Sequence, residues 1–148
     1  MKLSLAEPRY LKESINIISD LVNEARFKIT PDAIELVAMD PANVAMVIFK
    51  LLSSSFTEYN INKDIEIAIN LTNLRQILRR ASPSDMLSLE LDPENKLKIR
   101  LRGTSTRTFS LPIIDIEVSI PSVSLIPVTF TPVTLLAISF PIILITLL

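Results

Sequence analysis

The chain contains no cysteine and no histidine, and among its 148 residues there is a single glycine, Gly103. The lack of cysteine excludes disulfides, thiolate zinc sites and thiol nucleophiles. The lack of histidine removes the commonest general base, the commonest metal ligand and every Ser-His triad. One glycine cannot build either glycine-rich phosphate loop, GxxxxGK[ST] or GxGxxG. We therefore expect a protein that is not an enzyme and that uses no metal and no cofactor.

Charge is balanced overall but unevenly placed along the chain. The net charge is −1, so the whole chain is neither a basic nucleic-acid binder nor an acidic tail. All charged residues lie within residues 1–117, and Val118–Leu148 has none. Three prolines (Pro127, Pro132 and Pro141) cut this charge-free stretch into runs shorter than the ~20 residues of a membrane-spanning helix. We expect a strand-rich segment covered by protein, with a membrane anchor as the alternative.

Hydrophobic spacing predicts the elements of the first half. Alternation predicts a strand at Lys2–Leu5, and an apolar stripe with helical period predicts a helix over Tyr10–Ala25. The stripe consists of Leu11, Ile15, Ile18 and Val22, widened by Ile17 and Leu21. Three strands are then expected at Phe27–Thr30, Ile34–Met39 and Val44–Leu51, followed by a loop or single turn over Ser53–Tyr59.

The second half predicts a strand, a helix and three more strands. Alternation marks a strand at Ile65–Ile69, and Asn70 or Thr72 can cap a helix that runs to Ala81. A hairpin over Met86–Leu91 and Leu97–Arg102 precedes a strand at Arg107–Ile113, with cross-strand charge pairs on the hairpin's outer face. The order β-α-β-β-β-β-α-β-β-β predicts an α+β fold, a mostly antiparallel sheet with two short helices on one face.

Two features of the sequence have both a structural and a functional interpretation. The corner at Asp40–Asn43 is either an ordinary hairpin turn or a rigid loop that holds binding residues at the rim of a sheet. An enzyme would have to use carboxylates such as Asp32, Glu35 and Asp40, which lie at or near strand corners, and turn formation explains them more simply.

Several stretches occur in an order and spacing that are specific together. They are Leu21–Ala25, Leu36–Asp40 with Val44–Val47, Phe56–Tyr59, Asn70–Thr72 with Ile77–Leu78, and Phe109–Ile113. With the order of elements, they resemble the N-terminal domain of the archaeal and eukaryotic DNA sliding clamp, the proliferating cell nuclear antigen family. The resemblance covers about residues 1–117 and implies the sliding-clamp fold for them.

The resemblance also implies how the chain is divided. Residues 1–114 would form the N-terminal clamp domain and residues 115–127 the interdomain connector, because Ile120–Val123 is similar to that connector. Residues 128–148 would begin a second clamp domain, in which Val128–Phe140 looks like the first strand. That second domain would be incomplete and free of charge.

In this family the two helices of each domain face DNA, which implies a set of DNA-facing residues here. They would be Lys12, Arg75, Arg79 and Arg80, making non-specific, salt-dependent phosphate contacts. Glu13 and Ser19 stand where the family has bases, so helix one departs from the pattern. A solvated helix face is the alternative interpretation.

Two protein interfaces are implied in the same way. An edge strand would pair with a neighbouring subunit through Thr106, Arg107, Thr108, Phe109, Ser110 and Leu111. Part of an apolar pocket for hydrophobic peptide motifs would come from Met39, Val44, Met46 and Ile120. The family completes that pocket from its second domain, and plain core packing is the alternative for these apolar residues.

The function implied by the resemblance is that of a sliding-clamp subunit, a processivity factor that catalyses nothing. It would encircle double-stranded DNA in a trimeric ring, through hetero-association with other clamp subunits. It would tether polymerase, nuclease, ligase and clamp loader, and it would take no small-molecule substrate. Met1–Glu7 has no signal-peptide core, so we expect the cytoplasm, at the nucleoid, or the nucleus of a eukaryote. The alternative is a membrane-tethered or partner-covered truncated clamp whose apolar C-terminal tail dominates its behaviour.

Overall fold

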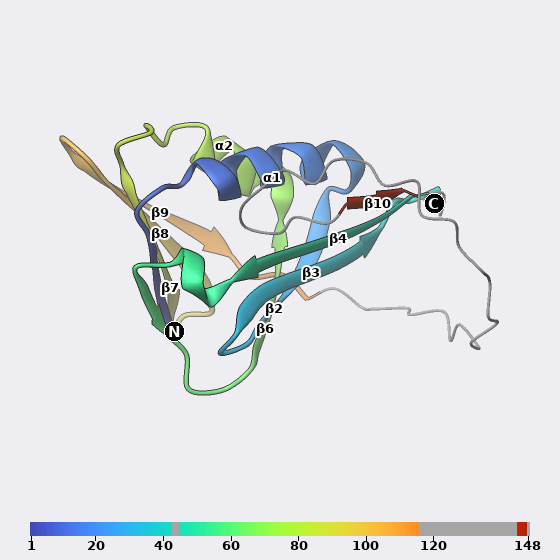
Figure 1. Ribbon diagram of the computed structural model, residues 1–148, viewed down its shortest axis with the longest axis horizontal. Helices are drawn as coiled ribbons and strands as arrows, with labels where there is room; N and C mark the ends of the chain where they lie inside the picture. Colours follow the sequence, from blue (N-terminus) through green and yellow to red (C-terminus); the bar gives the residue numbers. More distant parts are fainter. Residues whose placement is uncertain (43–44, 116–144, 148) are drawn as a thin grey trace.

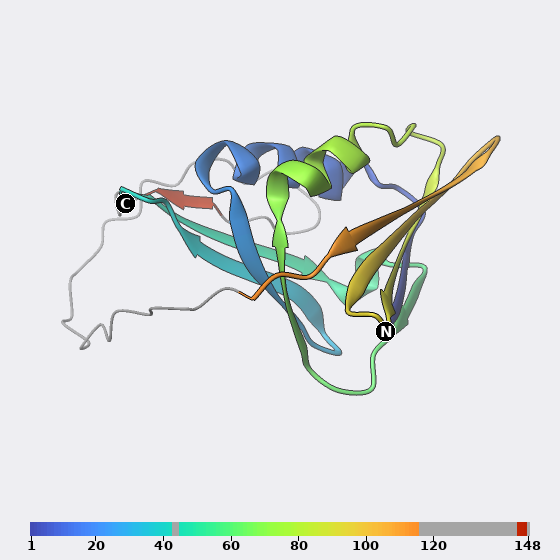
Figure 2. The same cartoon turned by 180° about the vertical axis from the view of Figure 1, so that it is seen from behind.

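The computed structural model describes residues 1–42, 45–115 and 145–147 (Figure 1). Within them, two helices lie side by side over the same side of two sheets (Figures 1 and 2). In chain order the elements are β1 (Lys2–Leu5), α1 (Arg9–Leu21), β2 (Glu24–Ile29), β3 (Ala33–Met39), β4 (Ala45–Leu52), the 3₁₀ turn η1 (Ser53–Ser55), β5 (Glu58–Asn60), β6 (Ile65–Asn70), α2 (Leu71–Leu78), β7 (Met86–Asp92), β8 (Lys96–Arg102), β9 (Thr106–Pro112) and β10 (Ile145–Leu147). The α+β class is confirmed.

The strands form two sheets, where the sequence had suggested one. Their orders are β5-β1-β7-β8-β9 and β10-β4-β3-β2-β6, and every pairing is antiparallel. The unit β1-α1-β2-β3-β4 is followed by a second unit of the same order, β6-α2-β7-β8-β9. The first strand of each unit belongs to the other unit's sheet. β1 pairs with β7, with Leu3 opposite Leu89, and β6 pairs with β2, with Phe27 opposite Ile67. As a result, β4 and β9 hold equivalent places in the two units.

A single hydrophobic core joins the inner faces of both sheets to the two helices. It contains every second residue of the strands and one face of each helix. Side chains on one face recur every two residues in a strand and about every 3.6 residues in a helix, so both kinds of element can direct apolar side chains into one interior. Burying each leucine, isoleucine or phenylalanine stabilises the fold by about 1.5–3 kcal/mol. The largest fully buried side chains include Leu3, Ile15, Ile18, Leu36, Phe49, Ile69, Leu78, Ile99 and Leu101.

Both helices are shorter than their sequence patterns predicted. α1 ends at Leu21, four residues before the predicted end, because β2 begins at Glu24 and pairs with β6 from its first residue, Glu24 opposite Asn70. The predicted cap of α2 is confirmed: the Asn70 side-chain oxygen accepts a hydrogen bond from the Asn73 amide at 2.9 Å. α2 ends at Leu78 and not at Ala81. Ile17 was also misplaced, being 44% exposed and outside the core.

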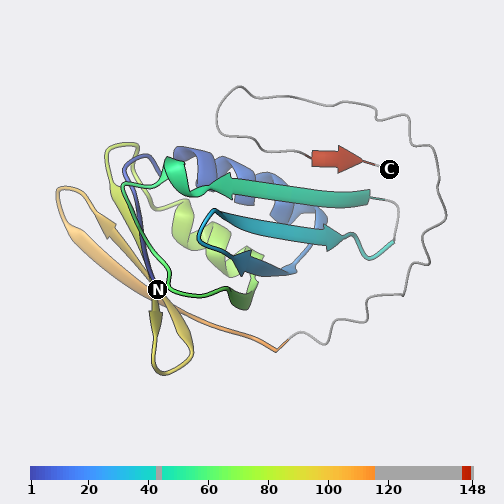
Figure 3. The same ribbon diagram turned by 60° about the horizontal axis from the view of Figure 1, so that its bottom comes forward.

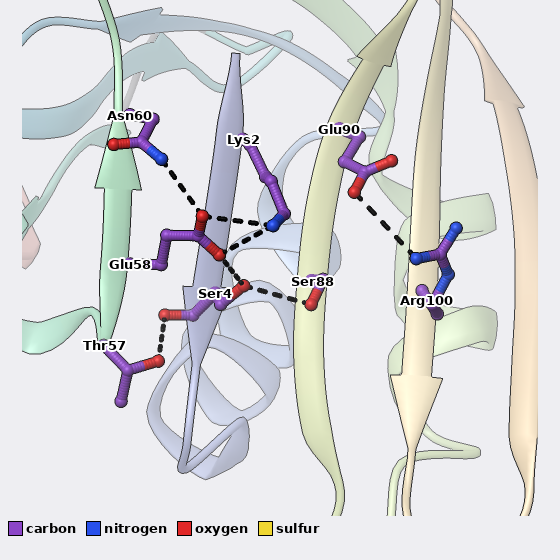
Figure 4. Close-up of polar contacts among 8 residues, drawn as sticks. All are labelled: Lys2, Ser4, Thr57, Glu58, Asn60, Ser88, Glu90 and Arg100. Atoms are coloured by element: carbon purple, nitrogen blue, oxygen red, sulfur yellow. Dashed lines mark hydrogen bonds and ion pairs between the residues drawn. The ribbon is translucent and has the colours of Figure 1, made fainter.

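Strand β5 was predicted as a loop or turn. It pairs with β1, and polar side chains on the outer face of the sheet hold it there through hydrogen bonds (Figure 4). Glu58 accepts hydrogen bonds from Lys2 at 3.1 Å and from Asn60 at 3.0 Å, and Thr57 donates to the Ser4 carbonyl at 3.0 Å. Lys2 and Ser4 lie more than 50 residues before β5, so no local pattern in three residues could reveal the strand.

Charge pairs link the strands β7, β8 and β9, and one of these pairs involves a buried aspartate. The predicted hairpin of β7 and β8 is confirmed with its charge pairs, since Lys98 lies 2.8 Å from Asp92 and Arg100 lies 4.0 Å from Glu90. Behind it, Asp85 is only 3% exposed, and its carboxylate pairs with Arg107 of β9 at 2.7 Å.

Gly103 packs directly against that carboxylate. A Cβ added at Gly103 would collide with Oδ1 of Asp85, while the other carboxylate oxygen accepts hydrogen bonds from Arg107 at 2.7 Å and from the Ser82 amide at 3.0 Å. Because both partners fix the carboxylate, it cannot swing away. This contact explains why the chain's single glycine stands here.

We expect Gly103→Ala to lower the free energy of unfolding by about 1–3 kcal/mol, as overpacking does at tight contacts. Ser105→Ala, at an exposed position of the same turn, is the matched control and should stay within about 0.5 kcal/mol of the parent. Urea unfolding of the three proteins measures both values. An unchanged Gly103→Ala protein would contradict the close packing.

Tyr59 links β5 to the turn between β2 and β3. Its hydroxyl donates to the Thr30 carbonyl at 2.6 Å, and its ring meets Phe56 edge to face at 5.0 Å. Burial, followed by the negative charges of Asp32 and Glu35, raises the pKa of Tyr59 to about 12.

A raised phenol pKa makes the fold sensitive to alkali. The stability that neutral Tyr59 contributes is fully present below its unfolded pKa of 10.0 and is lost as pH rises through about 12. Tyr59→Phe should remove the component of phenolate absorbance that appears near pH 12, and it should flatten the fall in unfolding free energy between pH 10 and 12. A titration identical to that of the parent chain would rule out this environment for Tyr59.

Candidate functional site

The helices α1 and α2 cover the sheets (Figure 2), and the predicted DNA-facing residues lie on these helices or directly after them. Lys12 is on α1 and Arg75 is on α2, while Arg79 and Arg80 follow α2 directly. The structure therefore brings all four to one layer of the molecule. Their individual contacts differ, and these contacts decide which positive charges face solvent.

Arg75 forms an ion pair that joins the two helices. Its guanidinium lies 2.7 Å from the Asp20 carboxylate of α1 and 3.3 Å from the Ser19 hydroxyl. Arg75 and Arg79 lie one helical turn apart, yet Arg75 is half-buried and turned to α1, whereas Arg79 is exposed. Much of the charge of Arg75 is thus balanced inside the helix layer.

Lys12 binds the end of α2. Its ammonium donates to the carbonyls of Ala81 at 3.0 Å and Arg79 at 3.4 Å. A cation at this place satisfies carbonyl groups that have no partner within the helix and interacts favourably with the helix dipole. Lys12 therefore joins the two helices as well as contributing positive charge.

Arg79 and Arg80 are the exposed cations of the layer. The Arg80 guanidinium lies over the ring of Phe109 in β9, 5.5 Å from its centre. Arg79 has no ion-pair partner within residues 1–42, 45–115 and 145–147. A cleft of about 370 Å³ next to them is lined by Pro8, Arg9, Lys12, Glu13, Ala81, Ser82 and Pro83. Positive charge thus gathers where α1 begins and α2 ends.

An apolar block lies on the outer face of β3 and β4. Met39 lies opposite Met46 and Val37 lies opposite Ile48, so the four side chains share one face of the sheet. Val37 is 62% exposed and Met39 is 44% exposed. Two of the predicted pocket residues are therefore neighbours, whereas Val44 and Ile120 fall outside the described residues. Sequence reasoning missed Val37 and Ile48, although alternation from Met39 and Met46 points to them.

The corner after β3 is stiffened by its acid. The Asp40 carboxylate accepts hydrogen bonds from the amides of Ala45 at 2.7 Å and Ala42 at 3.2 Å, and the Asp40 amide donates to the Ala45 carbonyl at 2.9 Å. This contact fixes the start of β4 and so the position of Met46. Asp40 thus acts as a turn former, in agreement with the simpler interpretation of the sequence.

The predicted edge strand is β9, the last strand of its sheet. Among the described residues, no strand covers its outer edge. Thr106, Thr108 and Ser110 are exposed on the outer face, and the alternate residues Arg107, Phe109 and Leu111 face the helix side. All six predicted edge residues therefore lie on one strand, with its polar and anchoring side chains on opposite faces.

Two further observations concern the part of the chain that is described. It contains no group of three or more histidine, cysteine, aspartate or glutamate side chains that could hold a metal ion. None of its helices combines the length and apolar character needed to cross a membrane. Of the corner carboxylates, Glu35 pairs with Lys50 at 2.7 Å and Asp40 binds its own turn.

Known proteins share both this sequence and this fold. The DNA polymerase sliding clamp of Nanoarchaeum equitans is 39% identical over 127 residues, 82% of this chain and 51% of the relative. That of Pyrococcus horikoshii is 42% identical over 103 residues, 70% of this chain and 41% of the relative. The chain thus spans about half, or less, of the length of these relatives.

Solved structures agree with the sequence relatives. The PCNA2–PCNA3 complex from Sulfolobus tokodaii superposes with a TM-score of 0.76 at 25% identity, over 84% of this chain and 51% of that chain. PCNA from Thermococcus kodakaraensis gives a TM-score of 0.74 at 28% identity, over 83% and 51% of the two chains. Residues 1–120 match the family model described as "Proliferating cell nuclear antigen, N-terminal domain". With its paired helix layer and its open edge strand, this chain therefore belongs to the proliferating cell nuclear antigen family of DNA sliding clamps.

Proposed function

We propose that this chain acts as a DNA sliding-clamp subunit, or as the N-terminal domain of one. It encircles duplex DNA together with other clamp subunits, tethers replication and repair proteins, and catalyses no reaction itself. The observation that carries this proposal is the match of residues 1–120 to the family model, together with the described fold, in which cations gather on the helix layer and β9 has an open edge among the described residues. Such a subunit would work at the nucleoid in the cytoplasm, or in the nucleus of a eukaryote.

The DNA contact proposed here is electrostatic and independent of base sequence. Arg79 and Arg80 are exposed and reach phosphates directly, whereas Lys12 and Arg75 keep the two helices together. Contacts to phosphates release counterions, so binding weakens as salt is added. That dependence suits a ring that must move along DNA without reading it.

The outer face of β3 and β4 is the proposed docking surface for partner proteins. Exposed Met39 and Val37, with their cross-strand neighbours Met46 and Ile48, offer an apolar block to hydrophobic peptide motifs of polymerase, nuclease, ligase and clamp loader. Methionine side chains adapt to varied apolar partners, which suits a surface used by several proteins.

The open edge of β9 is the proposed contact with other clamp subunits. Backbone groups of an edge strand can pair with a strand of another chain. The Sulfolobus tokodaii structure is a complex of two different chains, PCNA2 and PCNA3, which is a precedent for hetero-association. We expect this chain to join complete clamp subunits in a trimeric ring.

Replacing Arg79 and Arg80 with glutamine should weaken duplex binding. Two lost phosphate contacts should also lower the slope of log K against log salt by about 1.8. Fluorescence anisotropy of a labelled duplex between about 50 and 200 mM salt measures both effects. The control carries Lys50→Gln and Lys98→Gln, an equal charge change on strands β4 and β8 at positions that face away from the helices. Equal affinities for the two double variants would refute the assignment.

Asp20→Asn should have the opposite effect and strengthen DNA binding. The substitution removes a negative charge from the helix layer and frees Arg75, which Asp20 now holds at 2.7 Å. The expected gain is roughly two- to fivefold at low salt, the size of an exposed ion pair. Glu94→Gln, at an exposed hairpin turn, is the control. Adding Arg75→Gln should cancel the gain; a gain that survives would show that Arg75 plays no part in it.

A further inference from the structure

The outer face of β8 carries a row of cations. Leu97, Ile99 and Leu101 point into the core, so the residues that alternate with them point away from the core and the helices. These outward residues are Lys96, Lys98, Arg100 and Arg102, and we name them the cation row. Alternate residues of an antiparallel strand lie about 6.8 Å apart, so the row is a line of evenly spaced positive charges.

Acidic side chains balance the cation row at one end only. At the end next to the turn between β7 and β8, both lysines pair with carboxylates of that hairpin at 2.8 Å. Arg100 lies 4.0 Å from Glu90 (Figure 4), and exposed Arg102 has no ion-pair partner among the described residues. Positive charge on this face is therefore uncompensated at the end next to Gly103.

Hydroxyl groups flank the two arginines. Thr108 of β9 lies directly opposite Arg100, and Thr106 lies opposite Arg102; both threonines are exposed. Ser88 of β7 lies on the other side of Arg100. Directly opposed side chains of a sheet lie about 4.5–5.5 Å apart, so a group that binds an arginine also reaches a hydroxyl. The two arginines and the two threonines, named here the arginine end, thus offer hydrogen-bond donors to an anion.

The spacing of these charges fits an extended peptide. In an extended chain, alternate side chains point to one side at the same spacing of about 6.8 Å, so carboxylates at alternate residues match the two arginines one to one. Each guanidinium can hold a carboxylate through two parallel hydrogen bonds. Duplex DNA is the other common polyanion, but its proposed contact is the helix layer, on the opposite side of this sheet.

The arginine end is also separate from the apolar block on β3 and β4. β8 and β9, yellow and orange in Figure 3, lie at the opposite end of the molecule from the end of β3, where the apolar block begins (Figures 1 and 3). The arginine end is therefore a surface of its own, and the function proposed above assigns no partner to it.

We propose that the arginine end binds an extended acidic segment of a partner protein, with carboxylates at alternate residues of that segment. Arg100 and Arg102 bind the carboxylates, and the hydroxyls of Thr106 and Thr108 donate hydrogen bonds to them. Because these charges face solvent, the contact is screened by salt, and the affinity falls as ionic strength rises. The proposal goes beyond the proposed function, which rests on DNA, hydrophobic motifs and other clamp subunits.

A fluorescein-labelled peptide in which glutamate and serine alternate tests the proposal. The control peptide has glutamine in place of each glutamate. Fluorescence anisotropy at low ionic strength should show that the full chain binds the glutamate peptide about fivefold more tightly than the glutamine peptide, as two exposed ion pairs allow. Equal affinity for the two peptides would overturn the proposal.

Replacing Arg100 and Arg102 together with glutamine should remove that preference. The glutamate peptide should then bind about fivefold more weakly, at the level of the glutamine peptide. The matched control carries Lys28→Gln and Lys63→Gln, an equal charge change at exposed positions on β2 and in the loop before β6. The control should keep the affinity of the parent chain, and urea unfolding checks that both variants fold. Equal losses in the two double variants would refute a role for the arginine end.

Two other outcomes would also overturn the proposal. If replacing Arg79 and Arg80 with glutamine abolishes peptide binding and replacing Arg100 and Arg102 does not, the peptide binds the helix layer. If replacing Arg100 and Arg102 weakens binding of a labelled duplex but not of the peptide, this face binds nucleic acid. The peptide measurements contain no DNA and no other clamp subunit, so their failure is distinguishable from failure of the proposed clamp function.

Discussion

The exchange of first strands between the two repeated units is the constraint on which the rest of the structure depends. β1 completes the sheet of β7, β8 and β9, and β6 completes the sheet of β2, β3 and β4. Neither unit can bury its own sheet without the other, so the two share one core. The same exchange brings α1 and α2 side by side and leaves β4 and β9 in the outer part of their sheets. The surfaces proposed for DNA and for other subunits are both consequences of this packing.

Most of the positive charge on the helix layer also has a structural task. Lys12 binds the carbonyls at the end of α2, Arg75 binds Asp20, and Arg80 lies on Phe109. Each contact crosses from one element to another. A layer built this way presents cations at fixed positions without the self-repulsion of a uniformly basic surface. It is compatible with the net charge of −1 and with the loose DNA contact proposed above.

Local patterns in the sequence predicted the elements whose partners are close by. The hairpin of β7 and β8 was predicted with its charge pairs, because alternation and a tight turn specify both strands. By contrast, β5 was missed because Glu58 and Asn60 owe their conformation to β1, far away in the chain. Glu24 and Ala25 continue a helical pattern, yet pairing with β6 draws them into β2. The resemblance to a known family placed all four cations on the helix layer. Their individual contacts depend on distances between elements, which a local sequence pattern does not contain. Val44 and Ile120 fall outside the described residues.

One consequence of the ion pair between buried Asp85 and Arg107 concerns the kinetics of association. The pair fixes β9 from its inner face, as do the burial of Leu111 and the contact of Phe109 with Arg80. Among the described residues, no strand pairs with the outer edge of β9. A partner strand therefore meets a template that is already ordered, and little conformational entropy is lost when the two strands pair. Preorganisation of this kind shortens the search for the correct register after each encounter and favours rapid, reversible pairing of β9 with a strand of another chain.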